Sequence, residues 1–232
     1  MSQTKDAGIT IREALPADGP ALVEAIGRID EETEFLGTPG EYRRWWADGG
    51  AARIAALRER GTGVYLVALS GGETVGFLGA FPGAFAATRG ILYIGHVGLR
   101  RAWRGHGIGT LLFAAIEDWA RRNGAWRLDL RVDEANERGL ALYRKQGFAI
   151  EGRIAQSVKL ADRWHAHYWM AKALRELDGP AWQRLDPAPQ RPALSGAVTI
   201  RSLRPEDARL LCAWERRVLG EVPFALKDVP LP

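Results

Sequence analysis

The sequence predicts a mixed α/β fold, and three observations carry this prediction. Residues 64–70 and 73–80 are strand-like runs joined by Gly71-Gly72, which is the pattern of a β-hairpin. Residues 91–99 form another strand-like run, followed by an amphipathic helical pattern and then by a strand at 127–132. A chain that combines a hairpin with a strand, helix, strand unit folds into a mixed sheet with helices packed against it.

The chain before the hairpin predicts one strand and two helices. Residues 9–14 (ITIREA) form a short strand-like run, and Pro16-Ala17-Asp18 opens a helix. The apolar residues of this helix recur at helical spacing: Ala21, Leu22, Ala25 and Ile26. A second helical region is expected from about residue 40 to residue 60.

A longer helix is predicted after the strand at 91–99. From Ile108 to Ala120 the apolar residues form one stripe opposite a charged face, and Gly124 ends the helix. The remaining expected elements are a helix at 136–146, stopped by Gly147, and a closing pair of strands, from Phe148 onward and at 164–170.

The composition is that of a soluble globular protein. Of 232 residues, 47% are apolar and 26% are charged, and no run of about 18 apolar residues occurs. The polar start MSQTKDAG and the single cysteine, Cys212, indicate a cytoplasmic protein without a disulfide framework, in which this thiol is buried. The net charge of +4 is compatible with nucleic acid or with a small phosphorylated ligand, and composition does not decide between them.

The C-terminal part predicts a linker followed by a repeated unit. Residues 176–196 are rich in proline and indicate an extended linker. Residues 198–211 (VTIRSLRPEDARLL) restate residues 9–22 (ITIREALPADGPAL), although any strand followed by a capped helix looks similar. A partial second unit at 197–232 is too short for a complete domain, so we expect it to pack on the first domain or to exchange between subunits of a homodimer.

The stretch RGHGIGT, residues 104–110, is a candidate phosphate site. Gly105, Gly107 and Gly109 leave the backbone accessible where a helix begins, and the unpaired N–H groups of a helix N-terminus favour anions. No lysine follows Gly109, as a P-loop requires, and the spacing departs from a dinucleotide fingerprint, although Asp129 lies about 20 residues on. A glycine-rich connection without a ligand stays an alternative at this point.

Two motifs together resemble the GNAT superfamily of acyl-CoA N-acyltransferases. The motifs are Arg104-x-x-Gly107-x-Gly109 at a helix start and Asn136-x-x-Gly139-x-x-Leu142-Tyr143-x-x-x-Gly147-Phe148 after the next strand. The resemblance covers residues 9–174, and Gly139 departs from it because relatives usually carry alanine there. It implies a GNAT fold over residues 1–175, with acetyl-CoA as cosubstrate.

The resemblance also implies roles for individual residues in binding acetyl-CoA. The loop expected to hold the pyrophosphate consists of Arg104, Gly105, His106, Gly107, Ile108, Gly109 and Thr110. The strand end expected to pair with the pantetheine arm, and to direct an N–H group at the thioester oxygen, consists of Val97, Gly98 and Leu99. Asn136 is expected to hold the cofactor arm or the helix start, and Arg100 and Arg101 are candidates for the 3′-phosphate.

For the chemistry, Tyr143 is expected at the departing sulfur and His96 is the candidate general base. Rival bases are Glu31, Glu32 and Glu34. The acceptor pocket is expected from residues 31–46 and 81–89. His165 and His167 have the spacing of a metal pair, but no third ligand is evident, so no metal site is expected.

The resulting hypothesis is an N-acetyltransferase that moves the acetyl group of acetyl-CoA directly to a primary amine of a small molecule or a protein N-terminus. We expect neither nucleic acid nor a membrane among its partners. The alternative is a non-catalytic module that binds acyl-CoA.

Overall fold

The computed structural model describes residues 8–33, 35, 49–61, 63–83, 85–160 and 162–175. The chain divides into two compact units, Met1–Gly179 and Pro180–Pro232. The predicted linker at 176–196, the predicted repeat at 197–232 and Cys212 all lie outside the described residues, so their structures stay predictions. Within the described segments, no helix is both long and apolar enough to cross a membrane.

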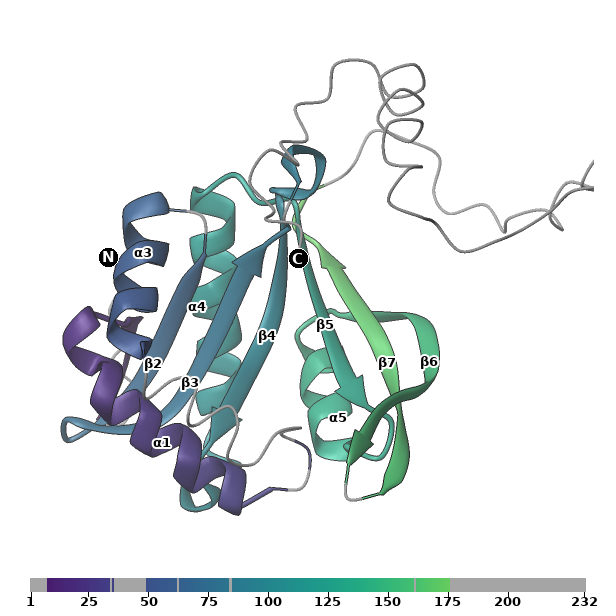
Figure 1. Cartoon of the computed structure of the whole chain (residues 1–232), viewed down its shortest axis with the longest axis horizontal. Helices are drawn as coiled ribbons and strands as arrows, with labels where there is room; N and C mark the ends of the chain where they lie inside the picture. Colours follow the sequence, from purple (N-terminus) through teal and green to yellow (C-terminus); the bar gives the residue numbers. More distant parts are fainter. Residues whose placement is uncertain are drawn as a thin grey trace, which may run out of the picture. The chain divides into compact units, whose positions relative to one another are not determined.

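A seven-stranded mixed sheet forms the centre of the first unit (Figure 1). Its strands are β1 (Ile9–Glu13), β2 (Val64–Ser70), β3 (Glu73–Pro82), β4 (Ile91–Leu99), β5 (Arg127–Asp133), β6 (Ala149–Leu160) and β7 (Arg163–Ala173). Their order in the sheet is β1-β2-β3-β4-β5-β7-β6. Only β4 and β5 are parallel neighbours, and all other neighbours are antiparallel. The predicted mixed α/β fold and the predicted hairpin are confirmed.

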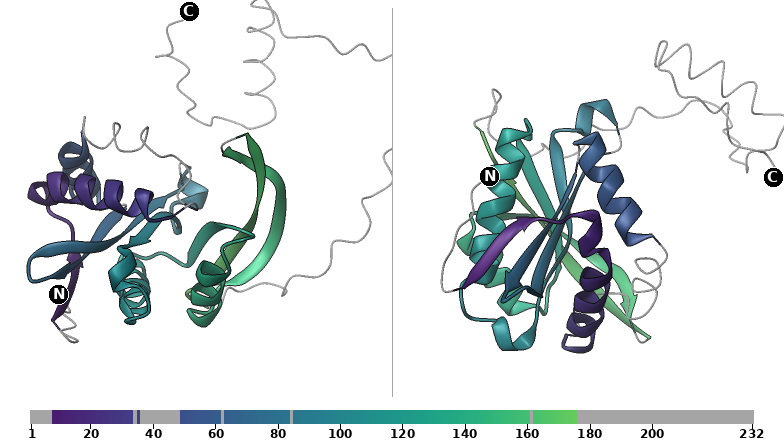
Figure 2. Two further views of the ribbon diagram at one scale, coloured as in Figure 1. Left: turned by 90° about the horizontal axis from the view of Figure 1, so that it is seen from below. Right: turned by 90° about the vertical axis from the view of Figure 1, so that its left-hand side faces the viewer.

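Helices cover both faces of this sheet. The α-helices are α1 (Gly19–Glu31), α3 (Gly50–Arg60), α4 (Ile108–Arg122) and α5 (Glu137–Lys145), and short 3-10 turns are η1 (Pro16–Asp18), η2 (Ala86–Thr88) and η3 (Arg101–Trp103). Helices α1 and α3 lie on one face, and α4 and α5 lie on the other (Figure 2). Of the helix predicted from about residue 40, the structure describes only α3, because residues 40–48 lie outside the described part.

Two apolar cores hold these layers together. On one face, the predicted stripe of α4 packs against the sheet, with Ile108, Leu112 and Ile116 almost completely buried. Phe113 contacts the rings of Tyr143 and Phe148 at centroid distances of 5.4 and 5.7 Å and so joins α4 to α5. On the other face, the core is formed by Ala14, Leu22, Ile26, Ile29, Ile54, Tyr65, Val67 and Phe77.

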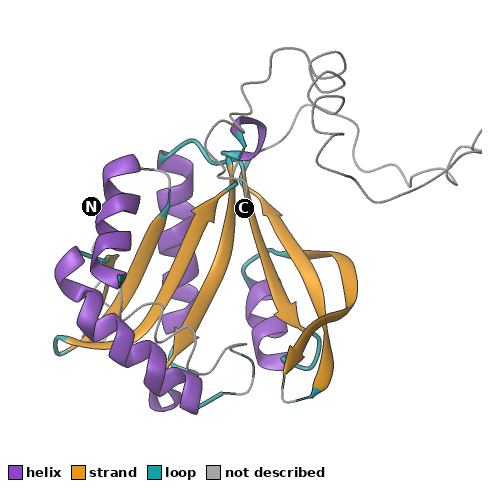
Figure 3. Cartoon of the chain, in the orientation of Figure 1, coloured by secondary structure: helices purple, strands orange, loops and turns teal. Residues whose placement is uncertain are grey.

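The central feature of the sheet is the separation of β4 from β5. Their parallel pairing runs from Ile91 opposite Arg127 to Ile94 opposite Leu130 and then stops. The register between β3 and β4 shifts at the same place, with Gly95 as the extra residue of a β-bulge. Beyond it, the carboxyl ends of β4 and β5 diverge (Figure 3). The edge of β4 that faces β5 therefore lacks a partner strand from Gly95 onward.

Candidate active site

The diverging strands open a cleft of about 1130 Å³. Its walls come from the end of α1, the second half of β4, the first turn of α4, the end of β5 and the helix α5. Eleven of the predicted site residues line it: His96, Val97, Gly98, Leu99, Arg104, Gly105, Gly107, Gly109, Thr110, Asn136 and Tyr143. The side chains of the other two do not, since His106 is exposed to solvent and Ile108 is buried in the core.

The three glycines of the loop serve two different purposes. Gly105 and Gly107 have φ angles of 84° and 80°, a conformation that other residues rarely adopt, and a Cβ on either would meet nothing within 4 Å. Gly109 has no such φ and begins the packing of α4, because a Cβ there would lie 3.0 Å from Cδ2 of Leu142. The first two glycines therefore shape the loop, and the third permits close contact between α4 and α5.

The first turn of α4 presents unpaired N–H groups to the cleft. The first hydrogen bond of the helix is donated by the Leu111 N–H to the Gly107 carbonyl at 3.1 Å. The N–H groups of Ile108, Gly109 and Thr110 precede it, and none of them has a hydrogen-bond acceptor within the described residues. Unpaired donors at the positive end of a 15-residue helix are suited to binding an anion.

Arg104 braces this loop through its side chain. Its Nε donates to the Leu99 carbonyl at 3.0 Å, and a terminal nitrogen donates to the Glu32 carbonyl at 3.3 Å. Partial burial lowers the pKa of Arg104, with repulsion from Arg101 and Arg138 adding to this and Glu32 opposing it. The guanidinium thus ties the loop to the end of α1 as well as lining the cleft.

Glu32 holds the connection after β4 in place. Its carboxylate accepts hydrogen bonds from the Arg101 N–H and from Nε of Arg100, the latter at 2.9 Å. Although partial burial opposes ionisation, these contacts hold the pKa of Glu32 below its usual value. Arg100 also lies 3.4 Å from a carboxylate oxygen of Glu73. These ion pairs argue against Glu32 as the general base and against Arg100 as a ligand of a 3′-phosphate. Of the other two rival bases, Glu31 lines the cleft and Glu34 lies outside the described residues.

We expect Glu32→Gln to lower the free energy of unfolding by about 1 kcal/mol at pH 7, a value reduced from that of a buried charged hydrogen bond because the pair is partly exposed. Since the folded state lowers the pKa of Glu32, its stabilisation is present above the unfolded pKa and disappears as pH falls through the folded value. Urea unfolding at pH 7 and at about pH 4 measures this difference. Glu24→Gln, which removes an exposed i,i+4 pair with Arg28, is the control and should change stability by less than about 0.5 kcal/mol. A difference between wild type and Glu32→Gln that does not shrink on acidification contradicts this account.

Asn136 caps the start of α5. Its Oδ1 accepts a hydrogen bond from the Gly139 N–H at 2.9 Å, as an N-cap residue does. A Cβ on residue 139 would lie 2.8 Å from Nδ2 of Asn136, so alanine there would displace the cap. Of the two roles expected for Asn136, the structure shows the helix start, and it explains why glycine at position 139 is compatible with this cap.

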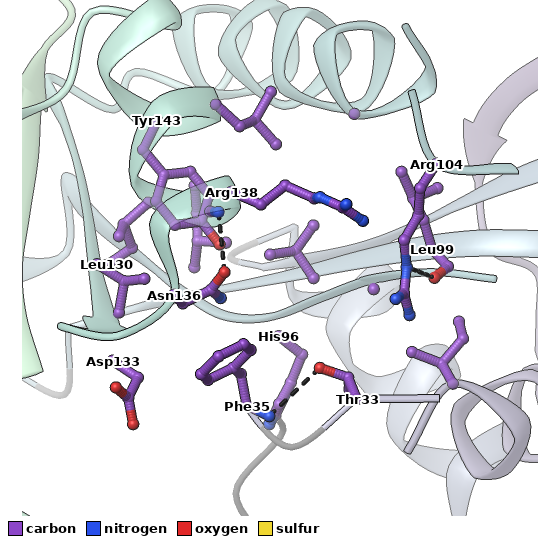
Figure 4. A pocket seen from close by; sticks show the side chains of 18 of the residues that line it. Thr33, Phe35, His96, Leu99, Arg104, Leu130, Asp133, Asn136, Arg138 and Tyr143 are labelled. Atoms are coloured by element: carbon purple, nitrogen blue, oxygen red, sulfur yellow. Dashed lines mark hydrogen bonds between the residues drawn. The ribbon is translucent and has the colours of Figure 1, made fainter. Parts of the chain in front are cut away.

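Tyr143 lies on α5 at the edge of the cleft (Figure 4). Its side chain is 7% exposed, and burial, with a contribution from Tyr93, raises its pKa to about 12. Among the described residues its hydroxyl has no hydrogen-bond partner. The ring is fixed by Phe113 and Phe148, so the hydroxyl is a positioned, protonated donor at the cleft.

His96 lies on the opposite wall, on β4. Its Nδ1 is 3.4 Å from the Tyr65 hydroxyl, and its ring packs against Phe81 with a centroid distance of 6.0 Å. Burial lowers the pKa of His96 to about 4, so the ring is neutral at pH 7. The structure therefore places the predicted base in the cleft but in surroundings that weaken it as a base.

Two functional candidates escaped the sequence reasoning, Arg138 and Asp133, and His167 was considered there only as half of a metal pair. The Arg138 side chain extends across the cleft toward Arg104 (Figure 4), and its guanidinium has no hydrogen bond or ion pair within the described residues. Its position two residues after Asn136, in the first turn of α5, was the available signal. Because arginines occur throughout the chain, the sequence did not distinguish this arginine from the others.

The described residues of the segment 81–89, which was expected to contribute to the acceptor pocket, do not themselves line the cleft. Phe81 pairs with Tyr93 and packs against His96, and both of those residues line it, so the contribution of this segment stays a prediction. Val158 of β6 and His167 of β7 line the cleft instead. Of the other expected contributor, residues 31–46, the residues Glu31, Glu32, Thr33 and Phe35 line the cleft, and their role in an acceptor pocket stays a prediction.

Comparison with known proteins agrees with this geometry. The family model of the GNAT acetyltransferases matches residues 26–148, more than half of the chain. Bovine (Bos taurus) thialysine N-epsilon-acetyltransferase is 30% identical over 88 residues, which are 38% of this chain and 48% of that protein. The chain thus spans about half the length of this curated relative.

Two solved structures share the fold. The structure of yncA from Salmonella typhimurium, determined with acetyl-CoA, is 22% identical with a TM-score of 0.63 and covers 75% of this chain and 98% of its own. The ribosomal-protein-alanine N-acetyltransferase of Brucella melitensis is 29% identical with a TM-score of 0.60, and the match covers 70% of this chain and 98% of that one. Together with the family model, these likenesses show that the chain belongs to the GNAT family of acetyltransferases.

Proposed function

We propose that this acetyltransferase binds acetyl-CoA in the cleft and transfers the acetyl group directly to a primary amine. The observation that carries the proposal is the set of unpaired N–H groups at the start of α4, beside the unpaired edge of β4. The Salmonella relative, which shares this fold, was solved with acetyl-CoA bound. As in the sequence prediction, residues 1–175 form the catalytic domain of this proposal and residues 197–232 a partial second unit.

Two features of the cleft support acetyl-CoA as its ligand. The loop from Arg104 to Thr110 offers main-chain N–H groups to a pyrophosphate, with open space above Gly105 and Gly107. The edge of β4 from Val97 to Leu99 offers main-chain groups to the amides of a pantetheine arm. Acetyl-CoA itself supplies an activated acetyl group as a thioester.

Arg138 adds a positive charge opposite the loop. Because it faces Arg104 with no acidic partner in the described part of the chain, an anion between the two arginines would relieve their repulsion. This makes it a stronger candidate for a phosphate group than Arg100, which Glu32 and Glu73 already engage.

We expect Arg138→Gln to raise the Kd for acetyl-CoA about 10-fold at low salt, because one charge-assisted contact is lost. Calorimetric titration at two ionic strengths measures this, and the salt dependence of the variant should be weaker than that of wild type. Arg122→Gln, at the far end of α4 and paired with Asp118, is the matched control and should bind normally. Equal affinities of Arg138→Gln and wild type at low salt would remove Arg138 from the binding site.

Tyr143 stabilises the leaving sulfur in this proposal. Its pKa of about 12 lies well above that of a thiol, about 8.5, so complete proton transfer to the thiolate is uphill by about 5 kcal/mol. The hydroxyl therefore acts by donating a hydrogen bond to the sulfur as the C–S bond breaks.

The acceptor amine must lose a proton before it can attack. An alkylammonium ion has a pKa near 10.4, and His96, with a pKa of about 4, is too weak a base for it by about 9 kcal/mol. His96 can still accept a hydrogen bond from an amine that is already neutral. The acceptor class remains a small-molecule amine or a protein N-terminus: the bovine relative is named for the ε-amine of thialysine and the Brucella relative for an alanine of a ribosomal protein.

The test is to titrate the purified full chain with acetyl-CoA and then to follow thiol release with a panel of primary amines. Binding followed by amine-dependent thiol release is the expected result. Binding without turnover on any amine would favour the non-catalytic module, and no binding at millimolar acetyl-CoA would overturn the proposal.

A further inference from the structure

A group of polar side chains lies where β5 and β7 reach the cleft, on the side away from Arg104. Asp133 ends β5 and pairs in register with His167 of β7. Figure 4 shows Asp133 on the wall of the cleft across from Arg104. Asp133 is only 4% exposed; one carboxylate oxygen accepts from the Ala135 N–H at 2.8 Å, and the other lies 2.6 Å from Nδ1 of His165.

The two histidines of β7 differ in what they face. His165 is held by Asp133 and does not line the cleft, whereas His167 does line it. Nδ1 of His167 is buried and has no hydrogen-bond partner among the described residues. Because the ring lines the cleft and Nδ1 is buried, Nε2 is the nitrogen through which this imidazole would exchange a proton with a molecule in the cleft.

The surroundings of His167 include groups that support its protonated form. Burial lowers the pKa of His167, as it lowers that of His96. For His167 the nearby carboxylates of Asp133 and Glu134 oppose this effect, while Arg131 and His165 add to it. A base that forms a cation during the reaction is better placed beside a buried carboxylate.

We propose that His167, supported by Asp133, takes the proton from the acceptor amine, and that the amine binds at this end of the cleft. The inference rests on the proposed acetyl transfer and names the proton acceptor and the class of acceptor for that reaction. His167 is a catalytic residue in this assignment, and Asp133 is a positioning residue. The acceptor is a cationic primary amine, because an anionic group would meet the buried carboxylate of Asp133.

The proton and electron balance of the step is complete without a further reactant. The amine attacks in its neutral form, after its ammonium group has lost a proton to water, and its lone pair forms the C–N bond to the thioester carbonyl carbon. Nε2 of His167 takes one proton from the nitrogen as this bond forms, the C–S bond breaks, and sulfur keeps its electron pair. The proton on His167 then passes to the thiolate, so that amide, free thiol and the one proton released to water are the products.

The test is steady-state kinetics of the full chain with an alkylamine that wild type accepts. His167→Gln should lower kcat about 10²-fold at pH 7 and leave the Kd for acetyl-CoA within about twofold. Tyr168→Phe, which changes the next residue of β7 on the opposite face of the strand, is the control and should retain wild-type kcat. His96→Gln tests the competing assignment of His96 as the base, and this variant should lower kcat less than His167→Gln does.

Two further readouts separate a proton acceptor from a structural residue. The acid limb of kcat/KM, expected below about pH 6.5 in wild type, should be absent in His167→Gln. The charged groups that face His167, and so affect its pKa and the position of this acid limb, are Arg131, Asp133, Glu134 and His165. Arg153 of β6 acts indirectly, through its ion pair with Glu134. Added imidazole should restore part of the rate of His167→Ala and none of the rate of Tyr143→Phe.

A wild-type chain that turns over no amine would overturn the proposed function itself. With an active wild type, three results would each overturn the assignment of His167 alone: a His167→Gln variant within threefold of wild-type kcat, an unchanged acid limb, or a larger loss in His96→Gln. If His167→Gln fails to fold, the imidazole response of His167→Ala decides, and absence of rescue counts against the assignment.

Discussion

Gly107→Val is expected to weaken acetyl-CoA binding by about 10² to 10⁴-fold, because it removes the backbone conformation on which the anion site depends. Gly107 precedes the first residue of α4 with a φ of 80°, which a β-branched residue adopts only under strain. A valine would turn the loop away from this conformation and place its side chain in the space now open above it. Losing two main-chain contacts of about 1.5 to 3 kcal/mol each accounts for the expected range.

The matched control for Gly107→Val is Gly124→Val. Gly124 follows the other end of α4 with a φ of 75°, also has open space around it, and does not line the cleft. Both variants should lose about 1 to 2 kcal/mol of stability from backbone strain, and only Gly107→Val should lose affinity in calorimetric titration. Equal affinities of the two variants for acetyl-CoA would show that the loop is not the phosphate site.

Tyr143→Phe is expected to lower kcat by about 10² to 10⁴-fold while leaving the Kd for acetyl-CoA nearly unchanged. The phenol is held by Phe113 and Phe148, and its hydroxyl has no partner in the described part of the chain, so the variant removes one donor from the cleft and little else. Because the hydroxyl is not paired with any described residue, thermal unfolding of the variant should occur at or above the wild-type temperature. A kcat equal to that of wild type would exclude Tyr143 from the reaction.

The parts of the fold that depend on local pattern were predictable from the sequence. The hairpin around Gly71-Gly72, the strand at 91–99 and the stripe of α4 all arise from side-chain periodicity within a few residues, and the structure confirms them. The positions of Gly105 and Gly107 in the left-handed region also agree with the reasoning that led to the phosphate loop. The two motifs that gave the family resemblance lie within one continuous stretch, from Arg104 to Phe148.

The parts of the site that depend on distant registers were not predictable. Asp133 and His167 are 34 positions apart, and only the pairing of β5 with β7 brings them together. The bulge at Gly95 that separates β4 from β5 has no signal beyond a glycine in a strand. In the same way, Arg100 and Arg138 look alike in the sequence, but one is held by two carboxylates and the other faces the cleft.

The close approach of Gly109 to Leu142 also connects the two ends of the proposed binding site. Leu142 is the residue before Tyr143, and it packs so closely on the first turn of α4 that a Cβ at position 109 would lie only 3.0 Å from its Cδ2. In the proposed binding mode, the loop that would bind the diphosphate is therefore in direct contact with the helix that carries the hydroxyl for the sulfur. On this proposal the packing of α4 against α5 sets the distance that the substrate must span between its diphosphate and its sulfur.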